Sequence, residues 1–95
     1  MASYRLAPEA EADLYRIWLY GAQRWGLDAA DDYQRALYER FDTIANDPMR
    51  YPAVDHIRRG YRRSVLGSDS IYYRVNRDTV EIMANLRKQR LDVWL

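Results

Sequence analysis

Apolar residues recur at helical spacing through the first half of the chain. One stripe follows Pro8, a residue favoured at the first position of a helix, and acidic residues occupy its first turns. A second stripe runs from about residue 28 to residue 46, where Asp47-Pro48 ends it. Because only a short break at Gly26 separates them, the pattern predicts an antiparallel helical hairpin. The stripes are Ala10, Leu14, Ile17, Trp18, Gly21, Ala22 and Trp25, then Ala30, Tyr33, Leu37, Phe41, Ile44 and Ala45.

The spacing of apolar residues changes from helical to alternating in the last third of the chain. Residues 61–66, 70–75 and 79–86 read as strands, and the Gly67-Ser68 and Asn76-Arg77-Asp78 connections have hairpin chemistry. Residues 1–7 alternate in the same way and predict an N-terminal strand, whereas residues 48–60 read as a loop. In the last strand the alternation predicts that one face carries Val80, Ile82, Ala84 and Leu86, and the other Glu81, Met83, Asn85 and Arg87.

This order of elements predicts an α+β fold in one domain, residues 1–95, with one small core. An N-terminal strand and a three-stranded antiparallel meander form an antiparallel sheet, and the helical hairpin packs on one of its faces. We expect Trp18, Trp25, Tyr33 and Phe41 to be core residues. Three other apolar residues lie off the helical stripes and should be exposed unless a partner covers them: Tyr15, Leu19 and Tyr38.

Charge is divided unevenly along the chain. Residues 1–55 have a net charge of −4 and residues 56–95 a net charge of +5, although the whole chain has only +1. Fourteen of the fifteen basic residues are Arg, which binds carboxylate or phosphate bidentately and stacks on aromatic rings. Four arginines within six residues repel one another, and an anionic partner would relieve that repulsion. They are Arg58, Arg59, Arg62 and Arg63.

Several kinds of chemistry find no support in the sequence. The chain has no Cys, a single His at position 56, and no glycine-rich phosphate loop, so we expect neither a metal nor a nucleotide cofactor. Metal-free RNA cleavage remains possible, but its base would have to be His56 or a strongly tuned Tyr. With no apolar run long enough to cross a membrane and no secretory leader pattern, we expect a cytoplasmic protein.

The order of short motifs along residues 4–92 resembles the ParE toxins of bacterial toxin–antitoxin modules. A strand leads into Pro-Glu-Ala, an Asp-Leu step follows, and Trp-Gly breaks the first helix. The later motifs are an Asn-Asp-Pro helix end, a basic Gly-Tyr segment and two strands. In this chain the motifs are Tyr4-Arg5-Leu6-Ala7-Pro8-Glu9-Ala10, Asp13-Leu14, Arg24-Trp25-Gly26, Asn46-Asp47-Pro48, Asp55-His56-Ile57-Arg58-Arg59-Gly60-Tyr61-Arg62-Arg63, Ile71-Tyr72-Tyr73-Arg74-Val75 and Val80-Glu81-Ile82.

The resemblance implies the RelE/ParE fold and a toxin that inhibits DNA gyrase and thereby replication. It also implies neutralisation by a ParD-like antitoxin encoded alongside. The toxin would then contact DNA only indirectly, through the antitoxin. We expect an acidic, amphipathic segment of the antitoxin to lie across the sheet and helices. The residues expected to bind it are Tyr15, Leu19, Arg58, Arg62, Arg63, Tyr72 and Arg74.

The C-terminal stretch departs from the resemblance. Family members usually end in Leu-His-Gln-Arg-Met-Asp, whereas this chain reads Leu86-Arg87-Lys88-Gln89-Arg90-Leu91-Asp92, with one extra residue and no His. The family associates this end with toxicity, so we expect target binding by Arg87, Lys88, Arg90 and Trp94. In the alternative, Leu91, Val93 and Trp94 fold back as a cap on the core.

The related RelE branch cleaves ribosome-bound mRNA and usually carries a basic residue just after a Gly-Asp-Tyr step. Here Asp69 and Ser70 take the corresponding positions and would repel or ignore phosphate. We therefore expect a toxin that acts by binding and is not an enzyme. Two alternatives stay open: a ribosome-dependent, metal-free endoribonuclease, and a non-toxic homologue that only binds an antitoxin. The nuclease would use Arg62, Arg63, Arg87 and Arg90.

Overall fold

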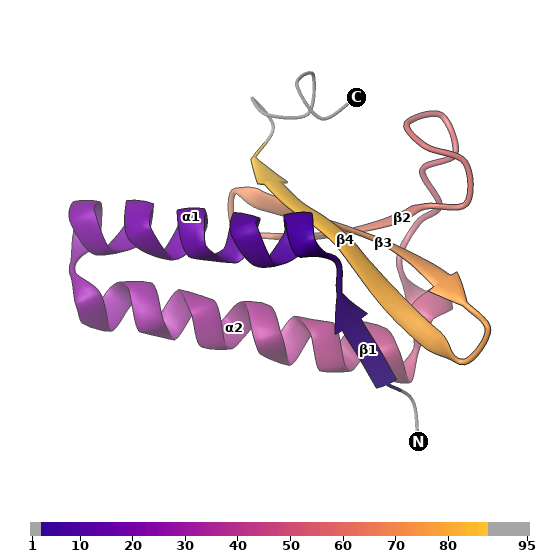
Figure 1. Ribbon diagram of the computed structural model, residues 1–95, viewed down its shortest axis with the longest axis horizontal. Coiled ribbons are helices and arrows are strands. Elements are labelled where there is room, and N and C mark those ends of the chain that lie inside the picture. Colours follow the sequence, from indigo (N-terminus) through magenta and orange to yellow (C-terminus); the bar gives the residue numbers. More distant parts are fainter. Residues whose placement is uncertain (1–2, 88–95) are drawn as a thin grey trace.

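The computed structural model describes residues 3–87 of the chain, and these residues form the predicted α+β arrangement (Figure 1). Two helices form an antiparallel hairpin, and four strands form one sheet in the order β1-β4-β3-β2. A short 3-10 helix, η1, opens the loop that leads into β2. The elements are β1 (Ser3–Leu6), α1 (Pro8–Trp25), α2 (Leu27–Asn46), η1 (Pro48–Arg50), β2 (Arg62–Leu66), β3 (Asp69–Asn76) and β4 (Thr79–Arg87).

Local sequence sets the limits of the hairpin as expected. Pro8 is the first residue of α1, and Ala7 offers no side-chain cap. Gly26 separates the helices with φ +100°, a conformation that L side chains rarely adopt, and its N–H donates to the Ala22 carbonyl at 3.1 Å. Asp47 ends α2 directly before Pro48.

The sheet is mixed, which corrects the expected antiparallel sheet. The meander of β2, β3 and β4 is antiparallel as predicted, but β1 pairs with β4 in parallel, from Ser3 opposite Thr79 to Leu6 opposite Ile82. The Ala7 N–H extends this ladder to the Ile82 carbonyl at 2.9 Å. Alternation in so short a segment predicts a strand but contains no information about its direction.

A β-bulge in β4 divides the core. Tyr73 pairs with Ile82 but its neighbour Tyr72 pairs with Ala84, so Met83 is one residue too many for β3. The extra residue reverses the faces, because successive side chains of a strand point to opposite sides. The main core lies between the hairpin and the sheet and contains Leu14, Leu37, Phe41, Ile44, Ile71, Tyr73, Val80 and Ile82. A second cluster on the other face contains Val54, Tyr61, Tyr72, Ala84 and Leu86.

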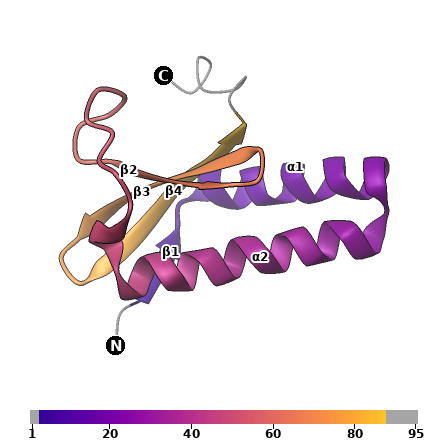
Figure 2. The ribbon, with the colours of Figure 1, turned by 180° about the vertical axis from the view of Figure 1, so that it is seen from behind.

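Two predictions about the core are wrong. Ala84 and Leu86 do not share a face with Val80 and Ile82, because the bulge lies between the two pairs. Trp25 is 62% exposed, although it continues the apolar stripe of α1. Figures 1 and 2 show the reason: the tip of the hairpin reaches well beyond the turn between β2 and β3, so no strand covers it.

The turn between β2 and β3 is held against α2 by one tyrosine. The Tyr33 hydroxyl lies 2.7 Å from a carboxylate oxygen of Asp69 and 2.9 Å from the Leu66 carbonyl oxygen. Gly67 has φ +57°, and a Cβ there would lie 3.0 Å from the same hydroxyl. The turn therefore needs glycine both for its backbone and for the space that Tyr33 occupies.

We predict that Gly67→Ala lowers the free energy of unfolding by about 2 kcal/mol, of which the left-handed backbone accounts for about 1. Gly60→Ala is the matched control, because Gly60 has φ +82° but no atom within 4 Å of the added carbon. Thermal unfolding should show a Tm loss of ~8–16 °C for Gly67→Ala and about half of it for Gly60→Ala. Equal losses would mean that the Tyr33 contact is unimportant.

An ion-pair network joins three strands on the face of the sheet away from the helices. The Glu81 side chain of β4 is only 6% exposed and binds Arg5 of β1 and Arg74 of β3, the latter with 2.7 Å between Nε and Oε1. Hydrogen bonds from Arg5 and then Arg74 lower the pKa of Glu81 to about 2. Because the folded state holds Glu81 ionised, its contribution to stability is complete above the unfolded pKa and disappears as pH falls toward 2.

We predict that Glu81→Gln lowers the denaturant midpoint at pH 7, where the wild-type carboxylate is ionised between two arginines. The gap between wild type and variant should shrink steadily as pH falls from about 5 to about 2. Glu39→Gln, which changes an exposed carboxylate of α2, is the control and should keep a small gap throughout. A gap for Glu81→Gln that is the same at pH 7 and pH 2.5 would contradict the assignment.

Candidate functional site

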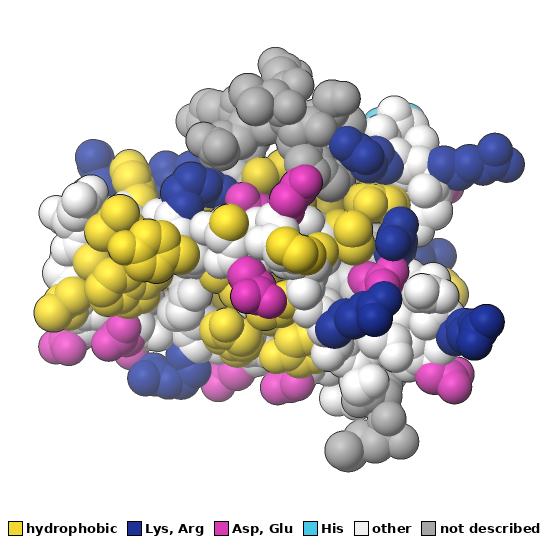
Figure 3. All heavy atoms as spheres, viewed as in Figure 1, with side chains coloured by type: hydrophobic (Ala, Val, Ile, Leu, Met, Phe, Trp, Pro, Cys, Tyr) yellow, Lys and Arg dark blue, Asp and Glu magenta, His cyan; other side chains and the backbone are white. Residues whose placement is uncertain are grey.

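The hairpin presents the apolar side chains that the sequence predicted to be exposed. Tyr15 is 65% exposed, Leu19 38% and Tyr38 41%. Two hydrogen bonds join the helices: the Trp18 indole N–H donates to Asp31 at 2.8 Å, and the Gln34 amide donates to the Leu14 carbonyl at 3.3 Å. In Figure 3 hydrophobic side chains gather over the hairpin, while a group of Lys and Arg side chains lies at the opposite end. We call Tyr15, Leu19 and Tyr38 the hairpin strip.

The structure divides the predicted arginine cluster between the two faces of the sheet. Arg62 pairs with Tyr73 of the main core and donates to the Tyr51 carbonyl at 2.6 Å, so its side chain supports the loop. Arg63 pairs with Tyr72 and lies on the opposite face, away from the hairpin. Adjacent residues of a strand point to opposite sides, so the cluster expected from the sequence is not one surface.

The face of the sheet away from the hairpin, which we call the outer face, carries the other predicted basic residues. Arg74 is about half exposed while it binds Glu81. Arg58 comes from the loop before β2 and lines a cavity of about 330 Å³ with Pro8, Glu9, Tyr61 and Met83. Of the predicted antitoxin-binding residues, the outer face therefore collects Arg58, Arg63 and Arg74.

One predicted contact residue is not accessible. Tyr72 is 2% exposed and lies in the second cluster beneath the loop residues Val54 and Tyr61. The prediction of Tyr72 as a binding residue needs correction, because a buried ring cannot meet a partner. Alternation along a strand places Tyr72 and Tyr73 on opposite faces, but it does not show that a loop covers Tyr72.

The predicted target-binding residues are described only in part. Arg87, the last residue of β4, faces the hairpin, and its guanidinium carbon lies 4.0 Å from the centre of the Tyr20 ring. Such stacking is a favourable cation–π contact. Lys88, Arg90 and Trp94 lie outside the described residues.

Sequence reasoning missed four residues that shape these surfaces. Arg5 and Glu81 form the network of the outer face, while Tyr20 and Arg24 lie beside Arg87 at the tip of the hairpin. The pairing of β1 with β4 would have identified the first two, but a single short strand does not reveal its register. The contact of Arg87 with Tyr20 depends on the bulge, which turns Arg87 toward α1.

Three tyrosines have raised pKa values, which is the wrong direction for a general base. Burial, and then the hydrogen bond to Asp69, raises the pKa of Tyr33, while burial raises the pKa of Tyr73 to about 12. The pKa of Tyr4 is also raised, first by burial and then by Asp42. A general base at neutral pH would need the opposite shift.

The arginines of the possible nuclease do not converge either, as far as the structure describes them. Arg62 supports the loop on the helix side of the sheet, Arg63 lies on the outer face, and Arg87 stacks on Tyr20. Within residues 3–87 no group of three or more His, Cys, Asp or Glu side chains could hold a metal ion. Neither described helix is long and apolar enough to cross a membrane.

Comparison with known proteins gives a consistent result. The sequence model of the family described as "ParE toxin of type II toxin-antitoxin system, parDE" matches residues 4–92. A Toxin ParE1 of Caulobacter vibrioides is 44% identical over 75 residues, which cover 79% of this chain and 78% of the relative. A Toxin ParE1 of Mycobacterium tuberculosis is 39% identical over 90 residues, 95% of this chain and 92% of the relative.

Solved structures share the fold at lower sequence identity. A chain of the chromosomal ParDE system of P. aeruginosa has a TM-score of 0.81 at 20% identity, covering 92% of this chain and 96% of that one. A chain of the RelBE2 toxin–antitoxin complex of M. tuberculosis has a TM-score of 0.67 at 18% identity, with 92% and 98% covered. The expected RelE/ParE fold is confirmed. With a family match over residues 4–92 and relatives near 40% identity, the chain belongs to the ParE toxins of type II toxin–antitoxin systems.

Proposed function

We propose that this ParE toxin is neutralised by a ParD-like antitoxin and that it inhibits DNA gyrase by binding, without chemistry of its own. The observation that carries the antitoxin half is the hairpin strip. Tyr15, Leu19 and Tyr38 are large apolar side chains that are exposed to water on a small domain. A partner that buried them would gain the free energy of removing apolar surface from water. Membership of the ParE family supports gyrase as the target.

An acidic, amphipathic antitoxin segment fits the chemistry of both surfaces. Its apolar residues would cover the hairpin strip, and its carboxylates would meet Arg58, Arg63 and Arg74 on the outer face. The hairpin covers the other side of the sheet, so the segment would have to wrap around the molecule to reach both surfaces. Buried aromatic contacts would supply most of the affinity, whereas exposed charge pairs would mainly speed association.

Action by binding is supported because the described residues do not bring together a general base and a group of cations. Metal-free RNA cleavage needs a base beside the 2′-hydroxyl and cations at the phosphate. The tyrosine pKa values that shift all move upward, and Arg62, Arg63 and Arg87 are held in three different places.

We predict that induced expression of the chain stops growth and DNA synthesis first, while mRNA stays full-length. Purified chain should also reduce supercoiling by purified gyrase, because the target is bound directly. Labelled thymidine incorporation, sequencing of mRNA ends and plasmid supercoiling gels measure the three effects, and co-expression of the ParD-like antitoxin is the control. Early codon-specific mRNA cuts would instead indicate the nuclease, and normal growth would indicate a non-toxic homologue.

We predict that Tyr15→Ala and Leu19→Ala each weaken antitoxin binding by ~10-fold or more, because each removes an exposed apolar contact. Met49→Ala is the control, since Met49 is 64% exposed but lies on η1 and not on the hairpin. Titration calorimetry gives the affinities, and circular dichroism checks that each variant remains folded. Unchanged affinity in both hairpin variants would show that the antitoxin docks elsewhere.

A further inference from the structure

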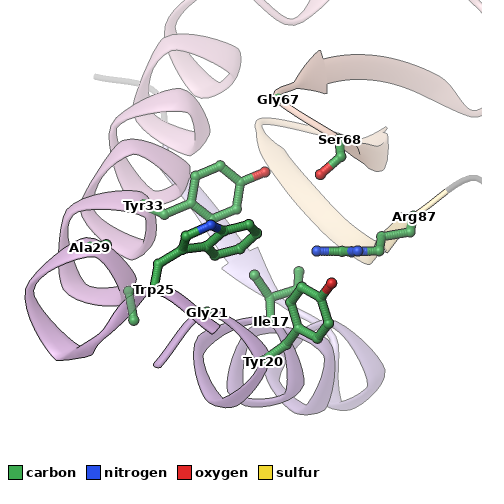
Figure 4. Close-up of a pocket in the computed structure, with 10 residues that line it drawn as sticks. Ile17, Tyr20, Gly21, Trp25, Ala29, Tyr33, Gly67, Ser68 and Arg87 are labelled. Atoms are coloured by element: carbon green, nitrogen blue, oxygen red, sulfur yellow. The ribbon is translucent and has the colours of Figure 1, made fainter. Parts of the chain in front are cut away.

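The tip of the hairpin encloses a pocket where the sheet ends. The helices continue beyond the turn between β2 and β3, so their sheet-facing side loses its cover there (Figures 1 and 2). The uncovered space has a volume of about 290 Å³, and its aromatic walls are Tyr20, Trp25 and Tyr33. In Figure 4 these three rings and Arg87 surround the cavity from α1, α2 and β4. We call this space the tip pocket.

Small residues make the tip pocket hollow. Gly21 of α1 lies against Ala30 of α2, and a Cβ on Gly21 would be in ordinary van der Waals contact with the Ala30 Cβ, at 3.5 Å. Ala29 and Gly67 also line the space and leave it unfilled. Gly21 and Ala30 are buried and belong to the same stripes that form the main core further along the helices. The tip pocket is therefore a continuation of the core that this chain does not fill with its own described residues.

Two arginines place positive charge beside the aromatic walls of the tip pocket, and one of them, Arg87, lines it. The guanidinium of Arg87 stacks on Tyr20 with 4.0 Å between its carbon and the ring centre. The guanidinium of Arg24 lies 6.0 Å from the Tyr20 ring centre and 5.5 Å from that of Trp25. A stacked guanidinium uses its face, so its N–H edge can still bind a carboxylate.

We propose that the tip pocket receives one large aromatic side chain of the antitoxin, and that a carboxylate next to it in the antitoxin binds Arg87. The proposal rests on the proposed neutralisation by an antitoxin and names a second contact besides the hairpin strip. The cavity volume is sufficient for an indole ring, and aromatic walls favour an aromatic guest. The two arginines select an acidic neighbour by charge complementarity, and Trp25, 62% exposed in the free toxin, would be covered.

Short peptides test the tip pocket without the antitoxin. The probes are acetyl-Trp-Glu-amide and acetyl-Trp-Gln-amide, added to the full-length, nitrogen-15-labelled chain. The first should bind with a Kd of about 1 mM and shift the indole N–H resonance of Trp25. The indole of Trp18, held by Asp31, should not move. The glutamine peptide should bind ~10-fold more weakly because it lacks the charge. No shift of Trp25, or equal affinity for the two peptides, would overturn the proposal.

Two variants of the toxin separate filling of the pocket from general damage. Ala29→Leu adds bulk inside the tip pocket at an exposed position of α2, and Ala12→Leu adds the same bulk at an exposed position of α1. Ala29→Leu should abolish peptide binding and weaken the antitoxin by ~10-fold or more, whereas Ala12→Leu should leave the peptide unaffected. Arg87→Gln should make the two peptides bind equally. If Ala29→Leu, shown to be folded by circular dichroism, bound the antitoxin as tightly as wild type, the proposal would fail while neutralisation itself still stood.

The same measurements distinguish other occupants of the tip pocket. If Trp94→Ala raised the affinity for acetyl-Trp-Glu-amide ~10-fold, the toxin's own Trp94 would be competing for the space, and the antitoxin assignment would be wrong. If the free toxin dimerised and Ala29→Leu abolished the dimer, a second copy would be the occupant. If no ParD-like antitoxin bound the wild-type chain at all, the proposed neutralisation would fail, and the peptide results would report on the pocket alone.

Discussion

One extra residue in β4 decides which side chains face the hairpin. With Met83 unpaired, Tyr73 lies opposite Ile82 and Tyr72 lies opposite Ala84, so every later residue of β4 changes sides. Ala84 and Leu86 turn outward and, with Tyr72, make a second core beneath the loop. Asn85 and Arg87 turn inward, which brings the Arg87 guanidinium onto Tyr20. Both the burial of the outer face and the charge at the tip pocket therefore depend on this bulge.

Residues of α1 stabilise the bulge, because they supply the hydrogen-bond partners that a neighbouring strand would otherwise give β4 after Met83. β1 ends at Leu6, opposite Ile82, so the backbone of Asn85 has no neighbour on that side. Asp13 accepts its N–H at 2.9 Å, and Arg16 donates to its carbonyl at 3.1 Å. The Asn85 amide also donates to the Ala10 carbonyl at 3.4 Å. Polar backbone groups at a buried edge need such partners, and here they lock α1 onto β4.

The helices and strands could be predicted from the sequence, but their register and their packing against one another could be predicted only in part. Pro8, Gly26 and Pro48 mark the helix limits, and the two turns separate the meander strands, because these residues act locally. The bulge could not be seen, since residues 79–87 alternate without a Gly or Pro and the cause lies in Asp13 and Arg16, about 70 residues away. The predicted exposure of Tyr15 and Leu19 is confirmed, because it follows from the apolar stripe of a single helix. The burial of Tyr72 was missed, because it depends on a loop that is distant in the sequence.

The length of the hairpin is greater than the sheet can cover. The strands end near the turn between β2 and β3, and the helices extend beyond it (Figures 1 and 2). Both helices continue past Gly21 and Ala30, and Trp25 and Leu27 are each 62% exposed. In a small domain every uncovered aromatic side chain forgoes stabilisation that the chain can hardly spare. Within residues 3–87 the overhang leaves Trp25 and Leu27 largely uncovered, and the antitoxin contact proposed for its arginine-flanked pocket would give that length a role.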